Sequence, residues 1–428
     1  MPSGEDRPLT PRDQLRSLFD RAVAVADPMR SLAAHLPERP KGRIIVVGAG
    51  KASARMAEAV EAHWGPCEGL VITRYGYGRV LSRIELAEAA HPVPDAAGEL
   101  ATARMLNLLS GLTEKDFVLA LISGGASALL VAPAKGMTLA DKQEVNDALL
   151  ASGAPISQVN IVRKHLSRVK GGQLAAAAWP APVLALALSD VPGDDPGLIG
   201  SGPTVGDDST VETVRQIFAR HNINPAPVVR AALGAGSTCL RPDDPKLSHT
   251  ETRVFAAPSQ SLAAAAELAQ SWGFEVQILG DRIEGEARDV AAQHAELALR
   301  ERQQRPKDAR ALLILSGGEL TVTRKGDGVG GPNAEYALAL AVALNGAGGI
   351  DALACDTDGV DGAAEVAGAV ISPDTLPRAA RLGLSPADHL LRNDAHSFFE
   401  RLGDQVVTGP TLTNVNDFRA IIVTGARD

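Results

Sequence analysis

Apolar and polar residues alternate along this chain with two different periods. Apolar runs that end at glycine or serine predict buried β-strands, and they lie at 43–50 (RIIVVGAG), 69–73 (GLVIT), 116–123 (DFVLALIS) and 183–189 (VLALALS). Helical periodicity occupies much of the remaining sequence, at residues 11–25, 51–64, 95–109, 139–150 and 157–168. This repeated order of strand, turn and helix predicts an α/β fold.

A break in the pattern predicts a domain boundary. Residues 239–252 (CLRPDDPKLSHTET) collect Pro, Asp and Ser between periodic segments. A second series of strands and helices follows, with RVFAA at 253–257, EVQILG at 275–280, a helix at 284–303 and ALLILSGGE at 311–319. A chain of 428 residues is also too long for one hydrophobic core. We therefore expect two domains, residues 1–245 and 250–428.

Composition narrows the class of protein. The chain has 42 Lys and Arg against 51 Asp and Glu, a formal net charge of −9, and only 3% aromatic residues. Both values disfavour a protein that binds nucleic acid or an anionic membrane. The three cysteines are far apart, and the N-terminal residues lack the apolar core of a secretory signal. We expect a soluble, cytoplasmic protein with no nucleic-acid or membrane partner.

The turn after the first predicted strand has the character of an anion site. Gly48, Gly50, Lys51 and Ser53 lie between a strand end and a helix start, where unpaired N–H groups and the helix dipole attract negative charge. Lys51 adds a full positive charge and suits phosphoryl transfer. A plain surface lysine is the alternative interpretation.

Neither familiar glycine-rich motif fits this turn. A dinucleotide-binding loop has a third glycine where Ser53 stands, and a Walker loop has glycine in place of Ile45 and Ser or Thr directly after Lys51. NAD binding also favours an acidic residue where the next strand ends in Thr73 and Arg74. Arg74 is compatible with NADP, which leaves a nicotinamide cofactor open.

A second glycine turn follows a later strand. Ser123, Gly124, Gly125 and Ser127 offer a row of N–H and hydroxyl donors that suits a phosphate or carboxylate, with a simple tight turn as the alternative. The Ser-Gly-Gly sequence recurs at 316–318, either by repetition of one construction or by chance in a glycine-rich chain.

Charged residues gather in two further places. Arg163 and Lys170 belong to a basic run, NIVRKHLSRVKGG, which is either a local site for an acidic substrate or a solvated helix face. Carboxylates follow two predicted strands, where they could hold Mg²⁺, accept a proton or merely form turns; they are Asp190, Asp356, Asp358 and Asp361.

Together these motifs resemble those of the class II glycerate 2-kinase family. The resemblance runs from about residue 12 to the C-terminus and includes VVGAGKAS, LISGGASALL, NIVRKHLSRVKGGQLA, SDVPGDD, GLIGSGPTVGD, LILSGGELTVT, GGPNAEYALA, DTDGVDG and TLTNVNDFRAIIV. It implies a Rossmann-like, doubly wound N-terminal domain, a C-terminal α/β domain of the MOFRL type, and an active site in the cleft between them. It also implies that the γ-phosphoryl group of ATP is transferred to the 2-hydroxyl of D-glycerate, with Mg²⁺ as cofactor. A homodimer is left open.

The resemblance and the motifs assign roles to individual residues. Lys51 is expected to be the active-site lysine, and Asp190 or Asp358 to accept the hydroxyl proton. Asp190, Asp356 and Asp361 are expected to hold the metal. The residues expected to contact substrate or nucleotide are Gly48, Gly50, Ser53, Ser123, Gly124, Gly125, Ser127, Arg163, Lys170, Ser316, Gly317, Gly318, Glu319, Arg324, Lys325, Asn333 and Glu335.

One segment departs from the family pattern. Many members have GRGGRNQE where this chain has GVGGPNAE, so that Val329 and Pro332 replace two arginines. We expect Arg324, Lys325 or another segment of the chain to supply the missing charge. Two rival functions also stay open: a hydroxypyruvate reductase, the name often given to relatives, and a protein that binds a sugar acid without catalysis.

Overall fold

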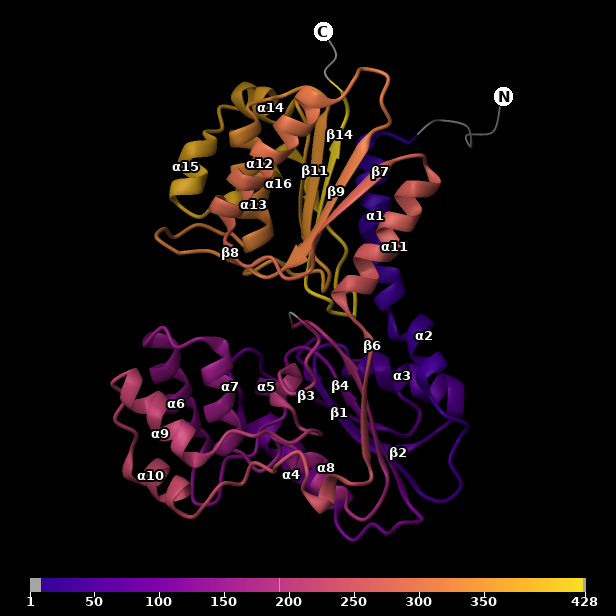
Figure 1. Ribbon diagram of the computed structural model, residues 1–428, viewed down its shortest axis with the longest axis vertical. Coiled ribbons are helices and arrows are strands. Elements are labelled where there is room, and N and C mark those ends of the chain that lie inside the picture. Colours follow the sequence, from indigo (N-terminus) through magenta and orange to yellow (C-terminus); the bar gives the residue numbers. More distant parts are fainter. Residues whose placement is uncertain (1–8, 192, 426–428) are drawn as a thin grey trace. The chain divides into compact units, whose positions relative to one another are not determined.

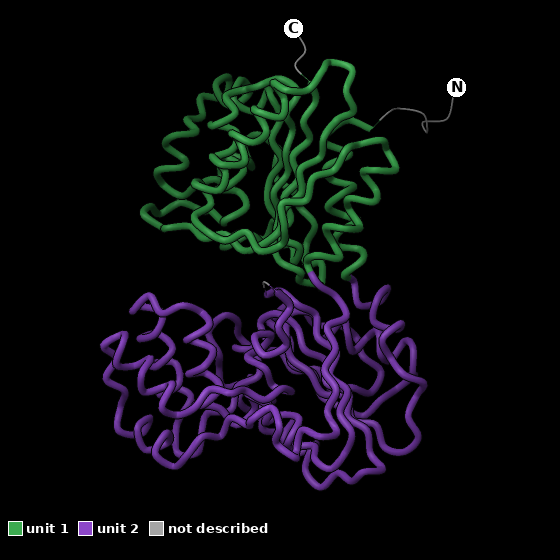
Figure 2. The backbone as a smooth tube through the Cα atoms, viewed as in Figure 1, with its two compact units in different colours: residues 1–26, 258–428 green, residues 27–257 purple. Residues whose placement is uncertain are grey.

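The computed structural model in Figure 1 describes residues 9–191 and 193–425. The chain forms two compact units: unit 2 is residues 27–257, and unit 1 joins residues 1–26 to residues 258–428 (Figure 2). This division differs from the expected domains of residues 1–245 and 250–428. The first helix and the strand at Thr250–Ala256 account for the difference.

Unit 2 is built on a six-stranded sheet whose neighbouring strands pair in parallel. The strand order, β3-β2-β1-β4-β5-β6, is that of the Rossmann fold and confirms the predicted doubly wound sheet. β1 and β5 are buried along their whole length, as expected for parallel strands covered on both faces. The strands are β1 (Ile44–Ala49), β2 (Glu68–Arg74), β3 (Glu85–Ala89), β4 (Phe117–Ile122), β5 (Val183–Leu188) and β6 (Thr250–Ala256).

Helices enclose this sheet. α4 and α8 pack on one face, where Met105 and Leu174 share a core with Val47 of β1. The buried side chains of α3 lie outside that core, and α3 packs against β1, β2 and β4. The helices of the unit are α2 (Pro28–Ser31), α3 (Ser53–Trp64), α4 (Ala96–Leu109), α5 (Ala126–Leu129), α6 (Leu139–Ala151), α7 (Ile156–His165), α8 (Gln173–Ala178), α9 (Val211–Arg220) and α10 (Pro227–Gly234), with short 3₁₀ turns at Leu32–His35, Ile199–Ser201 and Pro245–Leu247.

Four of these helices form a layer of their own beside the sheet (Figure 1). α6, α7, α9 and α10 bury Leu149, Val159, Phe218 and Val229 against one another. Capping boxes at Thr138 and Thr210 begin α6 and α9. This layer brings α6 and α7 to the candidate site.

Unit 1 contains a mixed six-stranded sheet of order β13-β12-β11-β14-β9-β7. β7 and β9 pair in parallel, whereas the other neighbours pair antiparallel. α1 and α11 pack on one face, and α12, α13 and α16 pack on the other. The strands are β7 (Glu275–Gly280), β9 (Leu312–Gly318), β11 (Ile350–Asp356), β12 (Gly368–Ile371), β13 (Gln405–Val406) and β14 (Asp417–Val423), with β8 (Gly285–Glu286) and β10 (Leu320–Thr321) as a separate pair. The helices are α1 (Pro11–Ala26), α11 (Pro258–Ser271), α12 (Ala287–Gln304), α13 (Pro332–Leu344), α14 (Thr375–Arg381), α15 (Pro386–Leu391) and α16 (Ala395–Leu402).

The first helix belongs to unit 1 because its apolar face forms part of that unit's core. Leu15, Leu18 and Phe19 are buried with α11 and the sheet, and the Phe19 ring centroid lies 6.0 Å from that of Phe418 on β14. The hydroxyl of Thr413 also donates to the carbonyl oxygen of Ala26 at 2.9 Å. Proximity in sequence to β1 therefore does not decide where α1 packs.

The predicted boundary is early by one strand. RVFAA was expected to open the second domain, but β6 pairs in parallel with β5 from Val183 to Leu188 and completes the first sheet. The two units therefore divide after Ala257, where α11 begins directly.

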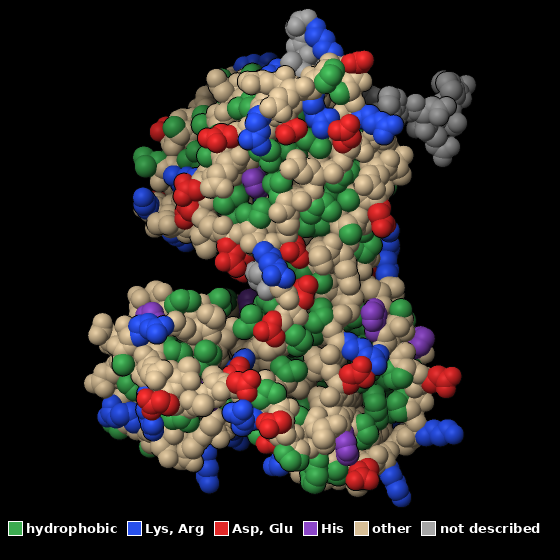
Figure 3. All heavy atoms as spheres, in the orientation of Figure 1, with side chains coloured by type: hydrophobic (Ala, Val, Ile, Leu, Met, Phe, Trp, Pro, Cys, Tyr) green, Lys and Arg blue, Asp and Glu red, His purple; other side chains and the backbone are tan. Residues whose placement is uncertain are grey.

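Charged side chains of both signs are interspersed on the face of each unit that Figure 3 displays. Among the described residues, we find no helix with the length and apolar character that crossing a bilayer requires.

Truncation of Phe19 should destabilise unit 1. Phe19→Ala removes a fully buried ring from the core of α1, α11 and β14, so we expect the free energy of unfolding to fall by about 3–5 kcal/mol. Denaturant unfolding followed by circular dichroism measures the change. The exposed neighbour Arg21→Ala is the control and should stay within about 0.5 kcal/mol of the parent. Equal stabilities of the two variants would contradict the packing of α1.

Candidate active site

The turns that follow β1 and β4 are joined by hydrogen bonds. β1 pairs with β4 in parallel through Ala49 and Ile122, so both strands end at the same edge of the sheet. The N–H of Lys51 donates to the carbonyl oxygen of Gly124 at 2.8 Å, and the N–H of Ala52 donates to the hydroxyl of Ser123 at 3.0 Å. The strand order reverses between β1 and β4, which is where open α/β sheets bind their ligands.

Glycine is required in this arrangement for the close approach of the two turns. Gly50 has a φ of 134°, and a Cβ atom on it would lie 2.1 Å from the Ser123 hydroxyl oxygen. A Cβ on Gly48 would lie 2.4 Å from the carbonyl oxygen of Leu121. Both glycines therefore allow contact between the two strand ends.

Two of the expected ligand-binding hydroxyls are engaged within the protein. The fully buried Ser53 hydroxyl lies 2.8 Å from the carbonyl oxygen of Gly50 and 2.7 Å from that of Ile72. Ser123 is also fully buried and accepts the N–H of Ala52. Both hydroxyls hold the turns in place, and direct contact with a ligand stays a prediction for them.

Anion-binding groups nevertheless gather at this edge. Among the described residues, the N–H groups of Gly124 and Gly125 have no hydrogen-bond acceptor, and Gly125 has a left-handed φ of 83°, as in turns that present successive N–H groups to an anion. A Cβ on Gly125 would lie 3.3 Å from Cγ of Lys51 and 3.1 Å from Cδ2 of His91. Lys51 and His91 are thus close to the donor row.

Asp190 is placed at the same edge by the sheet. β5 pairs in parallel with β4 through Ala187 and Ile122, and Asp190 follows two residues after β5 ends at Leu188. A carboxylate here shares the edge with Lys51 and the Gly124–Gly125 turn. Its predicted roles, as proton acceptor or metal ligand, stay predictions.

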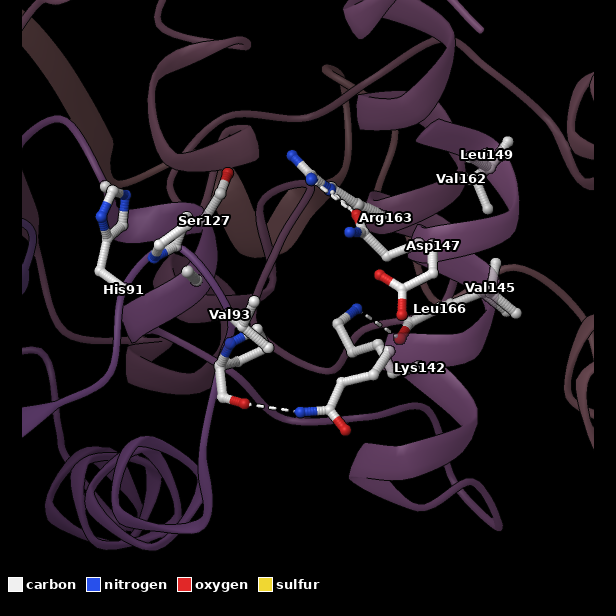
Figure 4. A pocket seen from close by; sticks show the side chains of 16 residues that line it. His91, Val93, Ser127, Lys142, Val145, Asp147, Leu149, Val162, Arg163 and Leu166 are labelled. Atoms are coloured by element: carbon white, nitrogen blue, oxygen red, sulfur yellow. Dashed lines mark hydrogen bonds between the residues drawn. The ribbon is translucent and has the colours of Figure 1, made fainter. Parts of the chain in front are cut away.

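A cavity of about 230 Å³ opens beside these turns (Figure 4). Gly125 and Ser127 line one side, residues 91–94 line another, and α6 and α7 supply the rest. The side chains of Lys142 and Arg163 point into it. Its lining residues are His91, Pro92, Val93, Pro94, Gly125, Ser127, Ala128, Lys142, Gln143, Val145, Asn146, Asp147, Leu149, Val162, Arg163 and Leu166.

The basic run at residues 163–170 is largely buried, so its interpretation as a solvated helix face is wrong. Arg163 is half-buried and donates twice to the side-chain oxygen of Asn146, at 2.9 and 2.6 Å. Lys164 forms a buried ion pair with Asp207. Lys170 is fully buried and donates to the carbonyl oxygens of Leu130 and Gly200 at 3.2 and 3.4 Å.

Lys142 is a site residue that the sequence did not reveal. It shares one face of α6 with Val145 and Leu149, and that apolar spacing of three and seven residues is the signal that it lies inward. Its ammonium group donates to the carbonyl oxygen of Leu166 at 3.1 Å. Burial, with a smaller effect from Arg163, lowers the pKa of Lys142 to about 7. Burial also lowers the pKa of Lys170 well below its ordinary value.

In unit 1, a buried network surrounds the start of α13. Asp361 accepts the backbone N–H groups of Asn333 and Ala334 at 2.9 and 2.8 Å, and its second oxygen lies 3.0 Å from His396 Nε2. The Asn333 amide donates to Asp361 at 3.3 Å and to Asp417 at 2.7 Å. These contacts engage both carboxylate oxygens of Asp361 within the protein, and its expected role as Mg²⁺ ligand stays a prediction.

The second Ser-Gly-Gly sequence has a different backbone from the first. Ser316, Gly317 and Gly318 continue β9 and pair antiparallel with Arg419, Phe418 and Asp417 of β14. The expectation of a turn after the strand is therefore wrong here. Pairing with β14 continues through Ser316, Gly317 and Gly318, beyond the apolar residues of β9. The sequence of β9 alone does not indicate this continued pairing.

Comparison with known proteins identifies the family. Residues 14–234 match the domain of unknown function DUF4147, and residues 312–417 match the MOFRL family. The D-glycerate 2-kinase of Thermotoga maritima is 37% identical over 94% of this chain and 95% of its own length. The chain belongs to the class II glycerate 2-kinase family.

Other members of this family support the assignment. A crystal structure of glycerate kinase from Thermotoga maritima superposes with a TM-score of 0.86 at 34% identity, over 96% of this chain and 99% of that one. A protein of Agrobacterium vitis, 50% identical over 96% of this chain and 94% of its own length, carries the name "Putative hydroxypyruvate reductase". The family resemblance and the two-part α/β fold are confirmed.

The remaining residues expected from the family pattern all lie in unit 1. Glu335 is buried, and its carboxylate contacts Arg288 and Asn393; burial raises the pKa of Glu335, and Arg288 opposes that change. Glu319, Arg324 and Lys325 are exposed. Their contact with a ligand stays a prediction, as does the replacement of the missing arginine by Arg324 or Lys325.

Asp356 and Asp358 form part of a turn. Each accepts the backbone N–H two residues onward at 2.8 Å, from Asp358 and Val360. Among the described residues, no three His, Cys, Asp or Glu side chains come together as a metal site would require.

Sequence analysis also missed Asp417 and the fully buried Arg419, which form an ion pair at 3.0 Å inside the apolar β14.

Addition of a methyl group at Gly50 should separate the two turns of unit 2. We expect Gly50→Ala to lower the free energy of unfolding by about 1–3 kcal/mol more than Gly76→Ala, because it overpacks the contact with Ser123. Gly76 is a matched control, since its φ is also positive, at 82°, but no described atom lies within 4 Å of the place that its methyl group would take. Chemical denaturation of both variants measures the difference, and equal losses would contradict the close approach.

Proposed function

We propose that the protein is a glycerate 2-kinase, which transfers the γ-phosphoryl group of ATP to the 2-hydroxyl of D-glycerate and gives 2-phosphoglycerate. The observation that carries this proposal is the group formed by Lys51 and the N–H groups of Gly124 and Gly125 at the edge of the sheet. The relatives named D-glycerate 2-kinase and glycerate 2-kinase, each 37% identical to this chain, support it.

The chemistry asks mainly for alignment and charge stabilisation. The 2-hydroxyl oxygen bonds to the γ-phosphorus while the bond from that phosphorus to the bridging oxygen of ADP breaks. Lys51 and the two glycine N–H groups would stabilise the negative charge on the transferred phosphoryl oxygens. Asp190 would take the hydroxyl proton, since it shares the sheet edge with Lys51, and Asp358 is the alternative.

Mg²⁺ is proposed as the metal cofactor. When bound, it would neutralise charge on phosphate oxygens. Kinase sites commonly hold it through one or two carboxylates together with the substrate phosphates, so a cluster of three carboxylates is not required. Asp190 is the proposed ligand in unit 2, and Asp356 or Asp361 is the alternative in unit 1, where hydrogen bonds already engage both oxygens of Asp361. A cytoplasmic location and a homodimer stay predictions as well.

Hydride transfer, the activity suggested by the name of the Agrobacterium relative, fits the residues less well. A third glycine in dinucleotide-binding loops allows close packing of helix and strand, and here Ser53 fills that position. Arg74, the residue compatible with NADP, lies over the Tyr77 ring at 4.7 Å from its centroid. Both observations favour the kinase.

A direct assay separates the three functions. Purified protein with D-glycerate, ATP and Mg²⁺ should release ADP in a glycerate-dependent reaction, and the product should carry phosphate on the 2-hydroxyl. Oxidation of NADH or NADPH with hydroxypyruvate would instead establish the reductase. Binding of glycerate without either reaction would establish a binding protein.

Lys51 should be required for turnover. Lys51→Ala removes the charge next to the Gly124–Gly125 turn, and we expect kcat to fall by at least about 100-fold while the circular dichroism spectrum is unchanged. Lys115→Ala, at an exposed lysine of the same unit, is the control and should keep the parental kcat. Near-normal kcat in Lys51→Ala would remove Lys51 from the mechanism.

A further inference from the structure

Three positively charged side chains of unit 2 lie close together at helices α6 and α7. They are Lys142 on α6, Arg163 on α7 and Lys170, which follows α7. Among the described residues, no carboxylate oxygen lies within 4.0 Å of a charged nitrogen of any of the three. Buried charges are ordinarily paired, so this group differs from the neighbouring Lys164, which pairs with Asp207.

Neutral oxygens fix these cations and leave donors available. Lys142 uses one of its three N–H groups on the carbonyl oxygen of Leu166. Arg163 donates to the Asn146 side chain, and another of its N–H groups lies 3.5 Å from the Asn160 oxygen. Figure 4 shows the ends of both side chains directed into the cavity. The cavity therefore presents two fixed cationic donors that neutral groups hold in place.

Asp147 does not neutralise this pair. It lines the cavity from the same helix as Lys142, but its side chain is exposed and forms no ion pair with either cation. His91 lies on the opposite wall of the cavity, where a Cβ atom on Gly125 would come within 3.1 Å of its Cδ2 atom. Asp147 is the one carboxylate among the residues that line the cavity, so Lys142 and Arg163 leave the lining with one excess positive charge, which an anion that entered between them would neutralise.

We propose that this cavity is the acceptor subsite and that Lys142 and Arg163 bind the carboxylate of a short 2-hydroxy acid. The inference rests on the proposed kinase function and assigns substrate recognition to residues of α6 and α7. A volume of about 230 Å³ is below the range of about 300–1,000 Å³ that is usual for larger ligands, so it suits a three-carbon acid better than a nucleotide.

The position of the cavity relative to Lys51 fits transfer to the hydroxyl. Gly125 lines the cavity and also adjoins Lys51. Ser127 lines it too, and its hydroxyl contacts that of Ser201 at 2.6 Å, which in turn donates to Asn160 beside Arg163. A short acid held by its carboxylate at Arg163 can thus direct its hydroxyl toward the Gly124–Gly125 turn, where the phosphoryl group would bind.

Steady-state kinetics test this assignment. Lys142→Met and Arg163→Met each remove one charge, and we expect the KM for D-glycerate to rise by about tenfold to 100-fold, the usual loss for a hydrogen bond to a charged group. The KM for ATP should change by less than about twofold, because the nucleotide does not enter the cavity. Lys135→Met is the matched control, since Lys135 is an exposed lysine just before α6, and both KM values should be parental.

The pH dependence of binding gives a second readout specific to Lys142. The pKa of Lys142, about 7, reflects burial and the nearby Arg163. Asp147 and His91 line the same cavity, and the charge of Lys170 lies close to Lys142 outside the lining. Deprotonation above this pKa removes its charge, so calorimetric affinity for D-glycerate should weaken between about pH 6 and pH 8. Arg163→Met should retain this dependence but shift it to higher pH, because the Arg163 charge no longer lowers the pKa of Lys142, whereas Lys142→Met should lose it.

The outcomes separate this inference from the function on which it rests. Parental glycerate KM values in folded Lys142→Met and Arg163→Met would overturn the subsite while leaving the kinase established. If the parent releases no ADP, the proposed function fails, and calorimetric titration with D-glycerate decides the site: binding that both variants weaken supports it, and absence of binding overturns it. Should Lys142→Met fail to fold, the half-buried Arg163→Met carries the test.

Discussion

The site in unit 2 depends on how closely the ends of β1 and β4 approach each other. The hydrogen bond from the Lys51 N–H to the Gly124 carbonyl oxygen, at 2.8 Å, fixes one turn on the other. Gly50 permits this approach because any side chain there would collide with Ser123. With the turns held in this way, the Gly124 and Gly125 N–H groups form a row of donors, and Lys51 lies beside them.

The two units use similar sequences for different purposes. In unit 2, Ser123-Gly124-Gly125 lies beyond the last pair of the strand and is free to turn, whereas in unit 1 the same three residue types at 316–318 stay paired with β14. Their polar neighbours differ accordingly. Hydrogen bonds of Asn333 join Asp361 to Asp417 at the start of α13, while Lys142 and Arg163 face a cavity. Substrate chemistry is therefore easier to assign in unit 2.

Much of the fold could be predicted from the sequence because parallel strands buried on both faces appear as continuous apolar runs, as in β1, β4 and β5. The turns at Lys51 and Ser123 could be predicted for the same reason, since they follow those runs. Lys142 could not, because a lysine in an amphipathic helix counts as polar until its neighbours show that it lies on the buried face. The packing of α1 and the pairing of β6 depend on tertiary contacts that periodicity does not encode.

The position of α1 also affects how the chain can fold during synthesis. Unit 2 is continuous from residue 27 to residue 257, so its core is complete once that stretch has left the ribosome. α1 is made before unit 2, yet its aromatic partner Phe418 lies on β14, almost 400 residues later. Until then the apolar face formed by Leu15, Leu18 and Phe19 has no native partner on β14. α1 can therefore complete its packing only after β14 has been synthesised, although α1 precedes the whole of unit 2 in the chain.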